Sequence, residues 1–379
     1  MHHNLQSITL RDQLKRDYPW TTAPLIVGAP MRVMSGPEMA LAISGAGGIG
    51  FIGPGLKPES TAEDLETARS IIFSSSSSSS SSSGIRTLER DVLPIGIGFQ
   101  LWNGSLETSA AAVGKYRPAA AWLFAPRDGL QAEVNTWTVR LREVSPETKI
   151  WLQVGTLQEA LDAVQSSREG GKPDVLVVQG AEAGGHGRAT DGVGVITLIP
   201  EIADALFGNE KGKNGMIPLF AAGGIMDGRG AAAALGLGAA GAVMGTRFLA
   251  ATEARISKGY QDEVLRASDG GKNTLRTQLY NHLRGTLGWP EQWSPRTVVN
   301  QSWVEQQAGV GFEELKKRHD RAVSEDGGSK AWGPEGRTAT YAGAGVGLVK
   351  SVEDAGAIVE GVRGEAVGII QGLQELAKL

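Results

Sequence analysis

The chain has 379 residues, a formal net charge of −4, 41% hydrophobic residues and no cysteine. A nearly balanced charge argues against nucleic acid or an anionic membrane as the main partner, and the apolar content is ample for a large core. Without cysteine there is no disulfide, thiolate nucleophile or cysteine metal site, so any redox chemistry must come from a bound cofactor.

Eight short apolar runs alternate with helical stretches along the chain, as in parallel strands that are buried on both faces. In chain order, the predicted strands are 24–29, 49–52, 93–99, 119–124, 149–153, 174–178, 217–221 and 239–244. This alternation predicts an α/β fold, a (β/α)8 TIM barrel. A doubly wound open sheet is the alternative, but no G-x-G-x-x-G motif follows the first strand, as a dinucleotide-binding sheet would need.

Several helix starts are marked by capping residues. Ser35 or Gly36 is expected at the N-cap of the first barrel helix. Thr156 and Glu159 match a capping box, and Asp227 is placed to cap the helix after the seventh strand.

The amino-acid composition changes after the eighth predicted strand. Residues 252–336 are charged, rich in tryptophan and helical in period. We interpret them as a mostly helical insertion that lies as a substrate lid over the mouth of a barrel formed by 1–251 and 337–379. The final segment, 351–379, predicts a closing pair of amphipathic helices. The ten serines of 74–83 cannot bury apolar area and predict a disordered surface insertion.

The loop after the sixth strand, 179–188, combines four glycines with one histidine and has no apolar period. Glycines at a strand end let backbone amides approach a ligand closely, and His186 is placed to move a proton beside that ligand. A tight turn with an incidental surface histidine is the plainer alternative. Ligands of such barrels bind at the carboxyl ends of the strands, so this loop belongs to the expected ligand face.

The loops after the seventh and eighth strands are typical of a phosphate site. Residues 222–225 and 245–248 supply glycine amides, a threonine hydroxyl and helix starts, and all of these donate to an anion without requiring a positive charge. Arg247 in the second loop is either an anion ligand or a structural ion-pair partner.

Amide side chains follow three other strands, at Gln100, Gln153 and Gln179. Neutral amides carry both donors and acceptors, which suits a planar heterocycle such as a flavin ring. The histidines are scattered, and none is paired at metal-binding spacing with a second histidine and a carboxylate, so we predict no metal site.

Four motifs together resemble those of the nitronate monooxygenases, formerly called 2-nitropropane dioxygenases. They are Gly28-Ala29-Pro30-Met31, 182–186, 222–225 and 245–248. The sequence E-A-G-G-H in the second motif favours the class I branch of that family. The resemblance implies an FMN-dependent TIM barrel that oxidises alkyl nitronates with dioxygen to a carbonyl compound and nitrite. Neutral nitroalkanes are a second substrate class compatible with it.

The resemblance also assigns roles to residues. His186 matches the family histidine near the flavin, a catalytic base for neutral nitroalkanes and a hydrogen-bond donor to nitronates. The implied FMN contacts are Pro30 and Met31 against the ring, Gln153 at the ring, Gln100 as a looser match, and Gly180, Gly185, Gly223, Gly224, Gly245 and Thr246 as the phosphate and ribityl cradle. Some members place arginine directly after the histidine, whereas here Gly187 precedes Arg188. This departure leaves the substrate-side role of Arg188 open.

The expected partners are therefore a small nitronate and dioxygen, with no nucleic acid and no membrane, and a homodimer is an assembly compatible with this interpretation. The nearest alternative function is an NAD(P)H-dependent flavin reductase, acting on quinones or enoyl thioesters on the same barrel. A cofactor-free isomerase of phosphosugars and a non-catalytic scaffold are more distant. We expect a cytoplasmic protein. The final Ala377-Lys378-Leu379 differs from the peroxisomal Ser-Lys-Leu address at one residue, which makes peroxisomal import the alternative.

Overall fold

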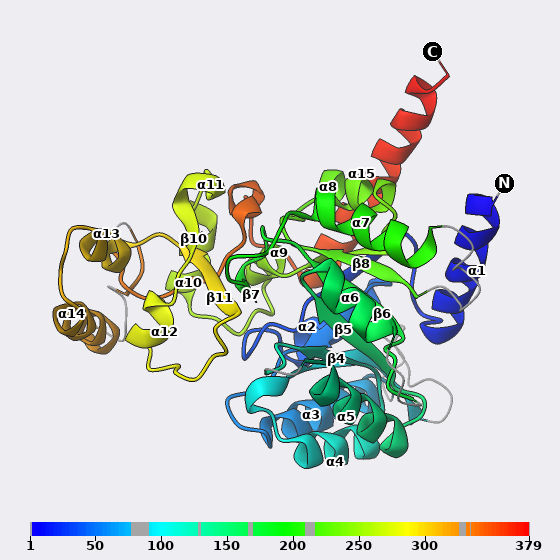
Figure 1. Ribbon diagram of the computed structural model, residues 1–379, viewed down its shortest axis with the longest axis horizontal. Helices are drawn as coiled ribbons and strands as arrows, with labels where there is room; N and C mark the ends of the chain where they lie inside the picture. Colours follow the sequence, from blue (N-terminus) through cyan, green and yellow to red (C-terminus); the bar gives the residue numbers. More distant parts are fainter. Residues whose placement is uncertain are drawn as a thin grey trace.

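The computed structural model describes residues 2–76, 91–127, 130–165, 170–208, 217–325, 331–333 and 335–378. Its centre is a closed barrel of parallel strands in the order β1-β2-β3-β4-β5-β6-β8-β9 (Figure 1). The strands are β1 (Leu25–Gly28), β2 (Ile49–Ile52), β3 (Leu93–Gln100), β4 (Pro118–Phe124), β5 (Lys149–Val154), β6 (Val175–Gln179), β8 (Leu219–Ala222) and β9 (Gly241–Met244). Because β1 pairs with both β2 and β9, the sheet closes on itself. The predicted TIM barrel and all eight of its strands are confirmed.

Helices surround the barrel, and each follows a barrel strand along the chain. They are α2 (Pro37–Gly45), α3 (Ser60–Ser76), α4 (Leu106–Tyr116), α5 (Leu130–Val144), α6 (Leu157–Val164), α7 (Val195–Phe207), α8 (Gly228–Gly236) and α15 (Ala355–Leu376). The predicted caps are present: Gly36 is the N-cap of α2, and Thr156 Oγ1 accepts the backbone N–H of Glu159 at 3.2 Å. The Asp227 side chain accepts the N–H groups of Arg229 and Gly230.

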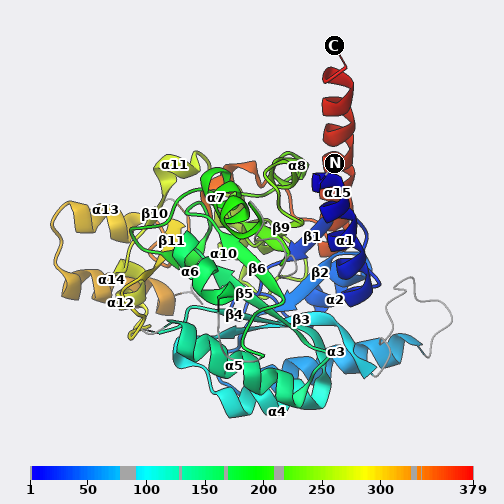
Figure 2. The same cartoon turned by 45° about the vertical axis from the view of Figure 1, so that its right-hand side comes forward.

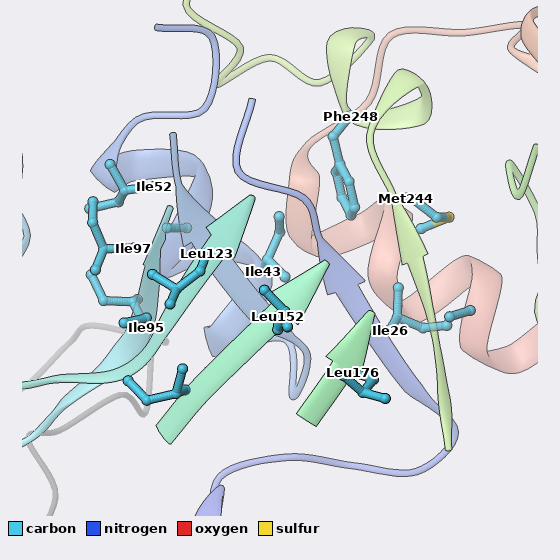
Figure 3. Close-up of a cluster of buried hydrophobic side chains, with 14 of the residues drawn as sticks. Ile26, Ile43, Ile52, Ile95, Ile97, Leu123, Leu152, Leu176, Met244 and Phe248 are labelled. Atoms are coloured by element: carbon cyan, nitrogen blue, oxygen red, sulfur yellow. The ribbon is translucent and has the colours of Figure 1, made fainter. Parts of the chain in front are cut away.

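Two different cores hold the barrel together. Between the strands and the helices the side chains are mostly aliphatic, and Figure 3 shows Ile97, Leu123 and Leu152 of three strands on this outer face. The interior of the barrel instead combines aliphatic side chains with large aromatic rings, and Trp122 and Trp151 are both fully buried there. The alternation of Trp122 with Leu123 along β4 sends one side chain into each core, as the two-residue period of a strand requires.

The segment after β9 extends away from the barrel (Figures 1 and 2). It contains α9 (Thr246–Leu249), α10 (Lys258–Arg266), α11 (Gly270–Asn273), β10 (Thr274–Arg276), α12 (Leu279–Leu283), β11 (Trp293–Val298), α13 (Gln301–Gln307), α14 (Phe312–Ser324) and the 3₁₀ helix η5 (Ala344–Leu348). We call residues 252–336 the insertion. Its helices agree with the prediction of a mostly helical insertion, but its two strands were not predicted.

The two strands of the insertion form a sheet with a strand of the histidine loop, which pairs with β11. The antiparallel sheet has the order β10-β11-β7, where β7 is Gly185–Arg188. The prediction of a loop was therefore wrong for 185–188, whereas 180–184 form no helix or strand. The residues of β7 have little strand propensity of their own, and the partner β11 imposes the extended conformation, with Pro295 opposite His186.

Two further predictions need correction. The end of the chain forms the single helix α15 rather than a pair, since its internal glycines do not interrupt the helix. The first three residues of the serine tract, Ser74 to Ser76, continue α3, where the Ser74 hydroxyl donates to the carbonyl of Ile71 at 3.0 Å. Residues 77–83 of the tract, and Leu379 of the C-terminal tripeptide, lie outside the described residues. Across the described residues, no helix combines the length and apolarity needed to cross a bilayer.

Candidate functional site

A cavity of about 220 Å³ opens at the carboxyl ends of the barrel strands and is lined by barrel loops and by the insertion. The predicted site residues that line it are Pro30, Met31, Gln100, Gln153, Gly185, His186, Gly223, Gly224, Gly245 and Thr246. Gly180 does not line it. The closed order of the eight strands therefore places these residues, which are distant in sequence, at one end of the barrel, as expected for this topology.

Gly180 and Arg188 have packing roles outside the cavity lining. A Cβ on Gly180 would lie 2.3 Å from Glu182 Oε2 and 2.7 Å from Val195 Cγ1, so this position needs glycine for close packing. Arg188 forms an ion pair with Glu159 at 2.9 Å between Nη1 and Oε1, and it pairs with Asp191 as well. Arg188 thus attaches the end of β7 to the barrel. It does not line the cavity, so these contacts give it a structural role rather than the substrate-side role that the sequence left open.

Arg247, which the sequence left as either an anion ligand or a structural partner, is 8% exposed and does not line the cavity. Its guanidinium donates to Glu353 Oε1 at 2.5 Å and to the carbonyl of Ser351 at 3.2 Å. These contacts tie α9 to the segment before α15. The structural alternative therefore holds for Arg247.

The loops after β8 and β9 present donors that protein groups do not use. Gly223 and Gly224 have φ angles of +116° and +73°, which favour glycine, and their N–H groups have no acceptor within the described residues. The Thr246 hydroxyl accepts the N–H of Gly343 at 2.9 Å, which leaves its own proton for a ligand. A Cβ on Gly185 would meet no atom within 4 Å, so this glycine keeps part of the cavity open.

Three amide side chains reach the cavity from the ends of β3, β5 and β6. Gln100 is oriented by its Nε2 group, which donates to Asn103 Oδ1 at 2.8 Å. Gln179 Nε2 lies 3.4 Å from the carbonyl oxygen of His186. Gln153 is the third. Together they give the cavity neutral donors and acceptors around its wall, as the sequence predicted.

The imidazole of His186 is clamped by two residues of the insertion. Its Nε2 atom lies 3.2 Å from Asn281 Oδ1 and 3.1 Å from Asn281 Nδ2. The ring of Trp289 stacks on it with centroids 3.4 Å apart and planes 4° from parallel. Burial lowers the pKa of His186 to about 3, against a raising contribution from the Asn281 hydrogen bond and with nearby arginines lowering it further. The imidazole is therefore neutral near pH 7, and burial makes it a weak base in this cavity.

Asn281 is held in place by a short chain of hydrogen bonds. Gln278 Nε2 donates to the carbonyl of Trp293 at 2.7 Å, which directs Gln278 Oε1 toward Asn281. Asn281 Nδ2 then donates to that oxygen at 2.7 Å. These contacts set the orientation of the Asn281 amide and, through it, the orientation of His186.

Two guanidinium groups, those of Arg32 and Arg284, complete the lining of the cavity. Arg284 Nη1 donates to the Tyr341 hydroxyl at 2.7 Å. Burial, and then the charge of Arg284, lower the pKa of Arg32. Among the described residues neither arginine forms an ion pair, and no aspartate or glutamate lines the cavity. The cavity is therefore electrostatically suited to an anion.

A third arginine joins β7 to the insertion without lining the cavity. Arg276 donates to the carbonyls of Gly185 at 3.0 Å, Ser294 at 2.6 Å and Ala183 at 3.0 Å. Burial, and then the charge of Arg296, lower its pKa to about 10, so it stays charged near pH 7. Sequence reasoning missed Arg276, Asn281 and Arg284, because no local motif marks residues that act by docking on a distant loop.

Comparisons with known proteins agree with this geometry. The nitronate monooxygenase family model matches residues 134–279. The chain is 57% identical over 360 residues to the nitronate monooxygenase npaC of Metarhizium robertsii, covering 95% of this chain and 96% of that protein. It is 33% identical to a nitronate monooxygenase of Neurospora crassa, covering 95% and 93% of the two chains.

Two solved structures share the fold. FabK from Thermotoga maritima aligns with a TM-score of 0.69 at 22% identity, covering 96% of this chain and 98% of that chain. Nitroalkane oxidase from Streptomyces ansochromogenes aligns with a TM-score of 0.68 at 21% identity, covering 95% and 99%. Identities this low establish the barrel architecture alone. The sequence relatives and the family model show that the chain belongs to the nitronate monooxygenase family, a family of flavin-dependent oxidoreductases.

Proposed function

We propose that the chain binds FMN in this cavity and oxidises alkyl nitronates with dioxygen, releasing a carbonyl compound and nitrite. The observation that carries the proposal is a neutral, clamped His186 beside two guanidinium groups in a cavity whose described lining holds no carboxylate. A nitronate is an anion with carbanion character, so it needs positioning and charge stabilisation more than deprotonation.

The residues present fit a phosphate-bearing flavin. The free N–H groups of Gly223 and Gly224 and the free hydroxyl proton of Thr246 are donors for a phosphate. The amides of Gln100 and Gln153 offer the mixed donors and acceptors that the edge of a flavin ring requires. When bound, the flavin supplies the electron acceptor for the substrate, and the protein supplies binding and orientation.

The protein groups divide the remaining work. Arg32 and Arg284 attract the anionic substrate and hold its negative charge. For a neutral nitroalkane a C–H proton must leave first, and we assign its removal to His186, the imidazole in the described cavity lining, although burial lowers the pKa of this group and makes it a weak base. Trp289 stacks on one face of that imidazole and fixes its plane, which sets the direction of the in-plane nitrogen lone pair that receives the proton.

An anaerobic titration of the purified protein, followed by its flavin absorbance, tests the proposal. We expect a nitronate to bleach the flavin and NADPH to leave it unchanged, and admission of air should then release nitrite. Bleaching by NADPH without nitrite release would select the NAD(P)H-dependent flavin reductase instead. A colourless protein that binds no added FMN would contradict both functions.

A further inference from the structure

The interior of this barrel holds large aromatic rings beside the branched aliphatic side chains that usually fill it. Trp122 of β4 and Trp151 of β5 are 1% and 0% exposed. Phe51 and Phe220 pack on Trp151 with ring centroids 5.1 and 4.6 Å away. Trp122 also lines the cavity. Indole and phenol rings lose one electron far more readily than phenyl or aliphatic groups, so the arrangement of the tryptophans and tyrosines matters chemically.

Three indoles and one phenol form a continuous line that starts at the cavity. The rings of Trp122 and Trp151 are stacked, with centroids 5.9 Å apart and planes at 24°. Trp151 meets Tyr18 edge-on at 6.0 Å, and its Nε1 donates to the Tyr18 hydroxyl at 2.6 Å. Tyr18 meets Trp20 edge-on at 5.7 Å.

The line ends at the face of the barrel opposite the cavity. Trp20 follows α1 (His2–Asp17) and is the partly exposed member of the line. Its Nε1 donates at 2.9 Å to the carbonyl of Gly48, directly before β2, which places it at the amino ends of the strands. Figures 1 and 2 both show α1 on the side of the barrel away from the insertion.

The fate of the indole protons favours movement of charge along this line. An oxidised indole traps the positive charge when it loses its N–H proton. Trp122 Nε1 is buried and has no hydrogen-bond acceptor among the described residues, and the acceptor of Trp151 is a phenol oxygen, which is a weak base. Both rings therefore keep their protons when oxidised. Trp20 donates its own N–H to the Gly48 carbonyl, but its ring is partly exposed, so water stabilises the positive charge there better than the buried core does and the charge stops at Trp20.

We propose that this line carries single electrons from the protein surface to the cavity, where they quench one-electron oxidants, of which light-excited flavin is the testable case. Trp122 gives one electron to the excited flavin, Trp151 refills Trp122, and Trp20 refills Trp151 across the ring of Tyr18. Trp20 then holds the positive charge near the surface, where a thiol or ascorbate in solution returns one electron and releases one proton, and the electron on the flavin passes to dioxygen, which becomes superoxide. The line thereby spares His186 and Trp289 from oxidation. This inference rests on the flavin-binding part of the proposed function and not on the substrate.

Laser-flash spectroscopy of the flavin-bearing protein, without nitronate, tests the line. A flash in the flavin band should produce a long-lived tryptophan radical in the wild type. Trp151→Phe keeps an aromatic ring but breaks the line at its centre, so the long-lived signal should be lost as the electron returns directly to Trp122. Trp137→Phe is the matched control, because Trp137 is also buried but packs on Phe99 outside the line.

Trp20→Phe provides a second test at the partly exposed end, where the new ring can keep the packing against the core and loses the hydrogen bond to Gly48, and it should also abolish the long-lived signal. Peptide mass spectrometry after illumination in air without reductant gives an independent result. Oxidation should concentrate at Trp20 in the wild type and move to Trp122 and Trp289 in Trp151→Phe. A yellow protein whose signal and oxidation map are unchanged by both substitutions would overturn this inference alone. A protein that binds no flavin would overturn it together with the proposed cofactor.

Discussion

The two halves of the cavity are built from different chemistry. The barrel half presents glycine amides, a threonine hydroxyl and glutamine amides, all on strand ends that the closed sheet holds in place. The insertion half presents Arg284 and Trp289 to the cavity. Trp289, together with Asn281 outside the lining, contacts the His186 ring. Apart from Arg32, the barrel half is neutral and suits the cofactor, whereas the insertion half adds the second guanidinium group, that of Arg284, and positions the base. A cofactor site and a substrate site thus come from separable parts of one chain.

Strand β7 joins the two halves. It leaves the barrel after β6, pairs with β11 of the insertion, and carries His186 between them. Arg276 of β10 donates to the carbonyl of Gly185 in the same strand. The catalytic candidate therefore belongs to both halves, which makes it the position whose loss should have the largest effect.

His186→Asn removes the base while keeping a polar side chain of similar reach. We expect the rate with a neutral nitroalkane to fall by about 10²–10⁴-fold, as loss of a general base typically does. The rate with a pre-formed nitronate should fall less, and the flavin should stay bound. Steady-state rates on both substrates, with the flavin absorbance as control, measure this. Equal losses on the two substrates would show that His186 orients the substrate rather than deprotonating it.

Gly224→Ala should damage the barrel half alone. At φ +73° a side chain is strained, and the added Cβ would lie 3.2 Å from Glu182 Cβ. A left-handed conformation costs roughly 1–2 kcal/mol, which corresponds to a roughly 5- to 30-fold weaker flavin affinity if the bound loop keeps that conformation. Flavin fluorescence titration measures the Kd.

The matched control is Gly236→Ala in α8, where an added Cβ meets no atom within 4 Å. The KM for the nitronate, measured at saturating flavin, should be unchanged in both variants. A raised KM with normal flavin affinity in Gly224→Ala would contradict the division between the two halves.

Arg284→Met should damage the insertion half alone. Loss of one cation at the exposed mouth should raise the KM for a nitronate about tenfold, or about 1.4 kcal/mol, with the flavin Kd unchanged. The dependence of KM on salt should also weaken, since a charge that attracts the substrate has been removed. Arg318→Met, on α14 of the same insertion, is the control, because Arg318 pairs with Glu305 and Glu314 away from the cavity. Equal effects of the two substitutions would count against a substrate role for Arg284.

Asn281→Asp should change the pH dependence more than the maximal rate. With a pKa of about 3, the wild-type imidazole is neutral over about pH 5–8, so its titration adds no slope to the nitroalkane rate there. A carboxylate beside Nε2 favours the imidazolium and raises the pKa of His186. The base is then lost as pH falls through the raised pKa, and the rate should drop on the acid side.

Asn281→Ala serves as the comparison, because it removes the hydrogen bond that raises the pKa of His186 and adds no charge. Its profile should stay flat over the same range. Rates measured from about pH 5 to 8 with a neutral nitroalkane distinguish the variants. An acid limb in the wild type, or matching profiles for Asp and Ala, would mean that Asn281 does not control the protonation of His186.

Much of the barrel half could be predicted from the sequence because its signals are local. A parallel strand buried on both faces is a continuous apolar run, as 174–178 shows, and a capping box such as that of Thr156 lies within one helical turn. Glycines at the ends of β8 mark places where a backbone must approach a ligand. Gly180 is the exception in this half, because sequence alone does not separate a glycine needed for packing from one needed for binding.

The insertion half depended on the tertiary structure. Asn281 lies 95 residues from His186 along the chain, and their contact exists only because β11 pairs with β7. No period or motif near Arg284 or Trp289 indicates that either faces the cavity. The sequence by itself therefore determined the barrel, its ligand face and its glycine loops, since apolar periodicity and backbone freedom are properties of neighbouring residues. The tertiary structure alone decided which side chains contact His186 and which guanidinium group of the insertion lines the cavity. The reason is that docking of the insertion brings together residues that share no local signal.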